Sequence, residues 1–395
     1  MKKNYWILAA AAVALAACSN DDTITVNQGI EEANTINFRT IVDGLTRASS
    51  TSDVTTDDIS SFNVTAFRHG ETADPYINDA TYTKQSSGTF TCDTKYYWPS
   101  SGTLDFYAYS VNSAVASQVQ KAAYNSFTFT PATDANSTYA DLVFATKQDI
   151  GKSGTYNSET ASYGADGVPL NFRHTASKIA IKVQNSSSTM KFSVDGWKVG
   201  YLDGQGTFTL SETETSSTGT LAFSDWTANT NAAEKSADTQ YSSTFDATAI
   251  AAEASATPLS GEFILVPQRI TAATAYANSG TPAANDKVNG AFIAVKLKIM
   301  NNDTNSTVIV DDGTEDHGTV WAIWPIGDDG TATFNWEPGK RYTYTVDLAG
   351  GGYYEQNKDT DADLDKLLDS AEIKFVTVTV DEWVPATGID VNNNN

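Results

Sequence analysis

The chain has 395 residues, enough for two domains, and a formal net charge of −23, which opposes binding to the phosphates of nucleic acid. Its 18 Tyr, 17 Phe and 8 Trp supply ample aromatic surface for packed cores. Three histidines leave little material for metal chemistry, and we expect no metal site and no cofactor.

The N-terminus has the layout of a secretory signal. Lys2 and Lys3 precede an apolar stretch over residues 6–17, which is shorter than the roughly 20 residues of a membrane-spanning helix. Leu15-Ala16-Ala17-Cys18 resembles a bacterial lipobox, in which the cysteine is acylated and becomes the mature N-terminus. We therefore predict a signal peptide over residues 1–17 and a lipid on Cys18. The alternative is an ordinary signal with an incidental cysteine.

A lipid on Cys18 has two consequences. Two or more acyl chains hold a protein stably on a bilayer, and residues 19–34 are polar and acidic enough to serve as the tether. Cys92 is then the one remaining thiol, so no intramolecular disulfide forms and stability must come from packing.

A separated strand follows the tether. One face of it carries Ile36, Phe38, Thr40 and Val42, and the other carries Asn37, Arg39 and Ile41. Next come Arg47 and Ala48, and then a Ser/Thr-rich run over residues 49–52. A lone arginine in such a linker is an accessible protease site. Residues 18–47 are thus predicted to be a pro-segment that contains a removable first strand.

Short strands dominate the next part of the chain. Residues 62–67 alternate, residues 96–99 and 104–109 flank a Pro-Ser-Ser-Gly turn as in a hairpin, and residues 141–145 form a further strand. Residues 147–168 lack periodicity and are predicted to be a long loop at a domain boundary. The first domain is accordingly assigned to residues 48–168.

The second domain is assigned to residues 169–395. Its first strand, at residues 178–183, alternates cleanly, with Ile179, Ile181 and Val183 facing inward. Further strands are predicted at residues 208–210, 263–266, 291–300, 320–324, 333–336, 342–348 and 373–380. Residues 225–258 fit a loop or a short helix, and residues 361–370 a short helix. Many strands without βαβ alternation predict an all-β chain of two tandem antiparallel β-sandwiches.

No catalytic motif emerges from the sequence. Gly151-Lys152-Ser153-Gly154 lacks the earlier glycine of a phosphate loop, because Thr146 stands there. The acidic run at residues 359–365 starts with calcium-loop spacing but has Leu364 at the sixth position and Ser370 at the twelfth. No Gly-x-Ser-x-Gly or His-Glu-x-x-His motif exists, so we expect no enzyme activity.

Several runs together resemble the fimbrillin family, the type V pilins of Bacteroidota. They are Tyr97-Trp98-Pro99 with Leu104 and residues 106–109; Asp141-Leu142; residues 170–179, which read LNFRHTASKI; Leu265-Val266-Pro267-Gln268; and residues 336–344, which read WEPGKRYTY. Each run alone is weak, but their order and spacing from about residue 35 to the C-terminus make the match specific.

The resemblance implies a transthyretin-like fold and a sequence of export, cleavage and assembly steps. Such pilins are exported as lipoproteins by the lipoprotein processing machinery, reach the surface of the outer membrane, and are cut by an arginine-specific protease, here between Arg47 and Ala48. The strand with Ile36, Phe38 and Val42 then leaves with the lipid. A strand from another copy, or from a related pilin, fills the groove and extends an extracellular fimbrium.

The donor strand is predicted at the C-terminus, on the valines Val376, Val378 and Val380. Two other functions stay open at this point. The chain fits a monomeric surface lipoprotein that binds a glycan or a host protein, and it fits an anchor or tip subunit of the same fimbria.

Overall fold

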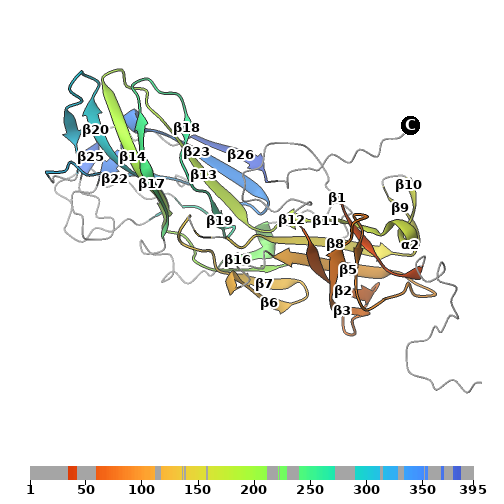
Figure 1. The fold of residues 1–395 in the computed structure, drawn as a ribbon. Helices are drawn as coiled ribbons and strands as arrows, with labels where there is room; N and C mark the ends of the chain where they lie inside the picture. The colour runs from red at the N-terminus through yellow and green to blue at the C-terminus, as the bar shows by residue number, and fades with distance from the viewer. Residues whose placement is uncertain are drawn as a thin grey trace, which may run out of the picture.

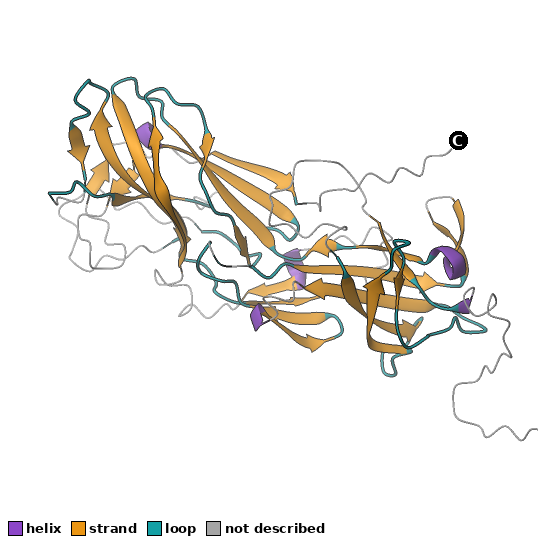
Figure 2. Ribbon diagram, in the orientation of Figure 1, coloured by secondary structure: helices purple, strands orange, loops and turns teal. Residues whose placement is uncertain are grey.

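The computed structural model describes most of the chain between residues 34 and 383. The described residues are 34–41, 59–111, 117–135, 137, 139–156, 159–210, 221, 223–228, 240–271, 290–311, 315–327, 333–350, 352–354, 366–368 and 377–383. Among them strands predominate, as predicted, and the helices described over their whole length are one short α-helix, α2 (Tyr163–Asp166), and two 3-10 turns, η2 (Phe223–Asp225) and η3 (Leu348–Gly350) (Figure 2). No helix in this part of the chain has the length and apolar character needed to cross a bilayer.

The N-terminal half is built on an eight-stranded sheet (Figure 1). In spatial order its strands are β11 (Val168–Asn171), β1 (Phe38–Ile41), β4 (Phe90–Thr91), β3 (Ile77–Lys84), β2 (Ser61–Arg68), β5 (Leu104–Val111), β8 (Leu142–Ile150) and β12 (Arg173–His174). The first and last strands of this order, β11 and β12, are consecutive in the chain with only Phe172 between them, and β11 also lies against β8. The sheet therefore curls until its two ends meet.

A four-stranded sheet covers the outer face of this curled sheet. Its order is β16 (Trp226–Ala228), β15 (Gly206–Thr209), β7 (Ser126–Phe129) and β6 (Val119–Ala123). Central strands of the first sheet are buried on both faces: Phe106 of β5 lies in the inner core, whereas its neighbour Tyr107 lies in the outer one. This double burial explains the near-continuous apolar run at residues 104–109.

The C-terminal half is a sandwich of two sheets. One has the order β18 (Thr257–Pro258), β13 (Ser177–Gln184), β23 (Lys340–Asp347) and β26 (Thr377–Glu382), and β19 (Phe263–Leu265) also pairs with β13. The other has the order β17 (Gln240–Ile250), β14 (Met190–Gly200), β20 (Phe292–Asn301), β22 (Val320–Pro325), β24 (Gly352–Tyr354) and β25 (Lys366–Leu368), with β21 (Val308–Val310) beside β20.

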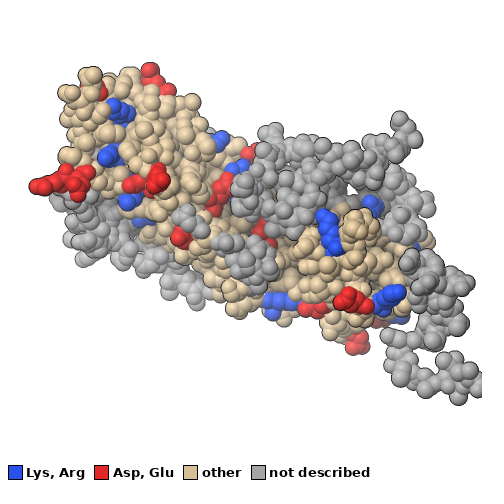
Figure 3. Space-filling view, in the orientation of Figure 1, with Lys and Arg blue, Asp and Glu red and all other residues tan. Residues whose placement is uncertain are grey.

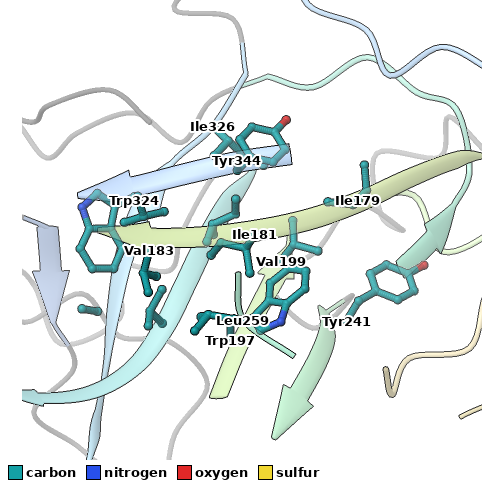
Figure 4. Close-up of a cluster of buried hydrophobic side chains, with 14 of the residues drawn as sticks. Ile179, Ile181, Val183, Trp197, Val199, Tyr241, Leu259, Trp324, Ile326 and Tyr344 are labelled. Carbon is teal, nitrogen blue, oxygen red and sulfur yellow. The ribbon is translucent and has the colours of Figure 1, made fainter. Parts of the chain in front are cut away.

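The core of this sandwich lies between the two sheets (Figure 4). Ile179, Ile181 and Val183 of β13 are all buried, which confirms the predicted inward face of that strand. They face Trp197 and Val199 of β14. Strand pairing is antiparallel except for β1 with β11 and β13 with β23, which run parallel.

Four local predictions are wrong. Residues 147–168 are not one long loop, because β8 continues to Ile150 and a hairpin of β9 (Ser153–Tyr156) and β10 (Glu159–Ser162) precedes α2. Residues 240–250 form the eleven-residue strand β17 rather than a loop or short helix. Within residues 361–370 the described part is the strand β25, and within 333–336 it is an isolated bridge between Arg269 and Asn335.

The sheets also cross the predicted boundary between residues 168 and 169. β11 starts at Val168 and pairs with β1 of the N-terminal half, and β15 and β16 join β6 and β7 in one sheet. A third core, which contains Phe144, Phe208 and Val266, therefore joins segments from both sides of that boundary. The two halves share this packing and are not connected by a linker alone.

Candidate functional site

The most informative position in the structure is the place of β1 in the curled sheet. β1 runs parallel to β11 from Phe38, opposite Val168, to Ile41, opposite Asn171, and on its other side Phe38 pairs with Phe90 of β4. β1 is thus an internal strand, although it is joined to the next described strand only through residues 42–58. Without β1, the N–H and C=O groups of both neighbours would face an empty slot.

The side chain of Phe38 fills the centre of the inner core. It is fully buried, and its ring meets three aromatic rings edge-on, with centroid distances of 4.7 Å to Tyr82, 5.3 Å to Phe106 and 5.9 Å to Phe62. Ile36, two residues earlier, is also buried. The predicted inward face of this strand is therefore correct at both positions, and Val42 lies outside the described residues.

The backbone before β1 is held as closely as the strand itself. Ile36 N–H donates to the carbonyl of Tyr96 at 2.7 Å, Trp98 N–H donates to that of Asn34 at 2.9 Å, and Val168 N–H donates to that of Asn37 at 2.8 Å. Lys152 also donates to the side-chain oxygen of Asn34.

Gly167 makes the close approach of β11 possible. Its φ is +77°, and a Cβ at this position would lie 2.9 Å from the carbonyl carbon of Phe38. Only glycine adopts this backbone conformation without strain and leaves this space free. The turn before β11 is thus shaped around the backbone of β1.

Burial raises the pKa of Tyr82, whose ring lies against Phe38. Its hydroxyl makes no hydrogen bond within the described residues. A phenol in this apolar setting is disfavoured as tyrosinate, so the pocket that Phe38 occupies favours uncharged groups.

The second candidate element, β26, is an edge strand. Its one partner among the described strands is β23, with Thr377 opposite Thr345 and Glu382 opposite Lys340. Val378 and Val380 lie opposite Tyr344 and Tyr342, yet the side chain of Val380 is 47% exposed. The third predicted donor residue, Val376, lies outside the described residues.

Trp383 holds the end of β26 in place. It is buried, and its ring stacks on His174 with a centroid distance of 3.8 Å and an interplanar angle of 5°. His174 is itself oriented by Asp141, whose carboxylate lies 2.9 Å from Nδ1. Trp383 N–H also donates to the carbonyl of Gly339 at 2.7 Å. The two residues are more than 200 positions apart, so no local sequence pattern pairs them.

The structure does not describe the residues predicted for lipidation and proteolytic processing. Cys18, Arg47 and Ala48 lie outside the described residues. Within the described residues no group of His, Cys, Asp and Glu side chains is arranged to hold a metal ion. Basic and acidic side chains are interspersed on the face shown in Figure 3. The indole rings of Trp98, Trp197, Trp324, Trp336 and Trp383 are buried, so they are not available to stack on a sugar ring at the surface.

The arrangement defines an all-β protein whose conspicuous feature is one buried, internal strand near the start of the described chain. Comparison with known proteins gives the family. The model of the family described as "Fimbrillin-like" matches residues 46–383, and the chain therefore belongs to the fimbrillin-like family. This is a family of fimbrial proteins and not of enzymes, and it implies a place in cell-surface fimbriae. A search of curated proteins found no match.

Three solved structures are similar to the chain. A fimbrial protein from Bacteroides vulgatus ATCC 8482 is 14% identical, with 89% of this chain and 99% of that chain covered and a TM-score of 0.51, which shows a shared fold. A putative cell adhesion protein from Bacteroides ovatus ATCC 8483 is 15% identical over 88% and 97%, with a TM-score of 0.39. The tip fimbrial protein Mfa3 from Porphyromonas gingivalis, truncated at its C-terminus, is 11% identical over 88% and 98%, with a TM-score of 0.35.

Proposed function

We propose that this chain is a structural subunit of cell-surface fimbriae that polymerises by donor-strand exchange. In this proposal it is exported as a lipoprotein acylated on Cys18, held at the outer membrane by its acyl chains, and cleaved between Arg47 and Ala48 by an arginine-specific protease. The first strand then leaves with the lipid, and another copy or a related subunit supplies a replacement strand.

The observation that carries the proposal is the position of β1. Cleavage at Arg47 would detach a segment that contributes a fully buried phenylalanine and lies between two strands, rather than at an edge. Its departure would open the ring of the curled sheet, expose Tyr82 and leave two strand edges unpaired, and all three changes are unfavourable in water. A strand from a neighbour reverses all three at once.

Head-to-tail donation does not close on itself, so it generates a filament. β26 fits the role of donor because it has one partner strand and an exposed valine, whereas β1 has two partner strands and a buried phenylalanine. Release of β26 breaks its pairing with one strand, whereas filling the groove restores pairing with two strands and buries an aromatic side chain.

A limited digestion tests the proposal. Protein that starts at residue 19 is treated with an arginine-specific protease, and the products are separated in detergent without heating. We expect one cut after Arg47 and a ladder of polymers. Arg47→Ala should abolish the ladder, whereas Arg68→Ala, which removes an exposed arginine elsewhere, should leave it intact.

Two outcomes contradict the proposal. Clipped protein that stays monomeric at high concentration would exclude polymerisation by this route and favour a monomeric surface lipoprotein that binds a glycan or host protein. Clipped protein that accepts a donor strand but donates none would favour a tip or anchor subunit. The lipid is tested separately, because a Cys18→Ala variant that still incorporates palmitate would rule out acylation at that residue.

A further inference from the structure

We propose that the groove around β1 has one fixed wall and one movable wall. The fixed wall is β4 together with residues 96–98, and the movable wall is β11. When β1 leaves, β11 loosens, and it closes again on the strand that takes the place of β1, whereas the fixed wall keeps its position. This inference rests on the proposed function for the natural departure of β1, but its test requires neither natural cleavage nor polymerisation.

β11 depends on β1 for its strand pairing. It runs parallel to Phe38–Ile41, and no other described strand pairs with it. Val168 N–H donates to the carbonyl of Asn37, so the alternation of the backbone turns the nitrogen of Pro169 away from β1. Proline has no N–H and is tolerated at a sheet edge for that reason. The sequence of β11 is therefore that of an edge strand, and departure of β1 removes its partner.

The fixed wall has anchors of its own. β4 pairs with β3 as well as with β1. The carbonyl of Tyr97 accepts a hydrogen bond from the Tyr76 hydroxyl at 2.7 Å. The buried ring of Trp98 meets Phe106 edge-on with a centroid distance of 6.0 Å. Because these anchors lie outside β1, this wall keeps its shape when the groove is empty.

Two features limit the extent of the movable wall. At one end Gly167 has a φ of +77°, and a glycine can change its backbone angles more freely than any residue with a Cβ. At the other end β12 is held on β8, because His174 pairs with Val143 and Thr175 N–H donates to the carbonyl of Leu142 at 3.0 Å. The movement is thus confined to β11 and the one residue after it.

The stability of the closed wall depends on the occupant of the groove. With β1 present, β11 pairs with it, and Val168 and Leu170 are buried in the inner core that also contains Phe38. Without β1, the backbone groups of β11 lose their partners and the two side chains border an empty slot. The conformational entropy gained on opening is the same in both cases. Opening of β11 therefore costs less free energy when the groove is empty.

This asymmetry gives strand capture a defined order. An incoming strand first pairs with the fixed wall, whose backbone groups are already in position, and β11 then closes on its other edge. Closing brings Gly167 against the new strand, where a Cβ would lie 2.9 Å from the carbonyl carbon at position 38. The movable wall thus controls the last step of capture and the first step of release.

A reversible cross-link between β1 and the fixed wall makes this testable. Thr35 and Tyr97 form an isolated antiparallel bridge, flanked by the backbone hydrogen bonds that Ile36 and Trp98 donate. In such a pair the Cα atoms lie about 4.5 Å apart, which suits a disulfide. The variant carries Thr35→Cys and Tyr97→Cys, with Cys92→Ser to remove the other thiol. The sequence of β11 stays untouched.

Amide exchange then reports on both walls. Protein that starts at residue 19 carries an inserted site for an unrelated protease after residue 47, and it is cut while the disulfide is intact. Reduction in dilute solution and gel filtration in mild urea remove the fragment. Release should accelerate exchange of the β11 amides about 100-fold and of the β3 amides less than about 5-fold. A synthetic peptide of residues 34–41 should restore the protection of β11, and the same peptide with Phe38→Ala should restore less.

The outcomes separate the two proposals. A β11 that stays protected after release would overturn the movable wall, and so would equal acceleration in β3. Either result leaves the proposed function in place if wild-type protein forms ladders after clipping at Arg47. Wild-type protein that forms no ladder overturns the proposed function instead, and loosening of β11 in the reduced variant would still support the movable wall.

Discussion

β1 and β26 are both short strands near the ends of the described chain, and they are held in opposite ways. β1 lies between two strands, and its phenylalanine is enclosed by three rings. β26 lies at a sheet edge, has one partner among the described strands and exposes Val380, and Trp383 directly after it is buried against His174. A strand bound like β1 is stable until a covalent cut frees it, whereas a strand bound like β26 can open by local fluctuation.

Phe38→Ala is the most severe test of this difference. Removal of a fully buried phenylalanine should lower the free energy of unfolding by about 4 kcal/mol. Urea unfolding of the unclipped chain measures it. The control is Val380→Ala in β26, which should cost less than about 0.5 kcal/mol because this side chain is half exposed. Similar costs for the two variants would contradict the contrast between the strands.

Trp383→Ala should affect β26 alone. Loss of the stack on His174 should favour local opening by about 3 kcal/mol, so amide exchange over Thr377–Glu382 should accelerate roughly 100-fold. The amides of β1 should keep their protection, and Trp383→Phe should give a smaller change than the alanine variant. Equal acceleration in both strands would mean that Trp383 supports the whole fold and not β26 in particular.

Gly167→Ala probes the close contact on the backbone of β1. We expect a loss of about 2 kcal/mol, because the positive φ strains any Cβ and the new atom would lie 2.9 Å from the Phe38 carbonyl carbon. Gly88→Ala is the matched control: its φ is +86°, but a Cβ there meets nothing within 4 Å. Thermal unfolding should rank Gly167→Ala clearly below Gly88→Ala, and equal losses would refute the steric part of the argument.

Substitution of His69 should cause the smallest change in stability of these variants. It also serves as a control, because His69 belongs to neither β1 nor β26. Its hydrogen bond to Asp105 and the charge of that carboxylate raise the pKa of His69 above 6.5. A raised histidine pKa stabilises the fold below pH 6.5, and this contribution is lost as pH rises through the folded-state pKa.

Because the His69 side chain is 51% exposed, screening limits the effect to a few tenths of a kcal/mol. Wild-type protein should melt about 1 °C above His69→Gln at pH 5.5 and at the same temperature at pH 8.5. A difference that grows with pH would have the wrong sign.

Much of the fold was predictable because period-two alternation is local. Residues 178–183 predicted an inward face of Ile179, Ile181 and Val183, and Ile36 and Phe38 were correctly placed inside. Alternation failed where burial on both faces or a polar exposed face hides it. β17, for example, carries a Ser/Thr-rich sequence, and its place is set by pairing with β14.

The sequence by itself determined the all-β class, the presence of an isolated apolar strand that a lone arginine follows closely, and the inward face of that strand. Each of these depends on residues close together in the chain. Only the tertiary structure decided that β1 is an internal strand, that β11 and Gly167 close the ring around it, and that Trp383 anchors β26 on His174. Those contacts join residues far apart in sequence, and they depend on how the sheet curls, which no local pattern records.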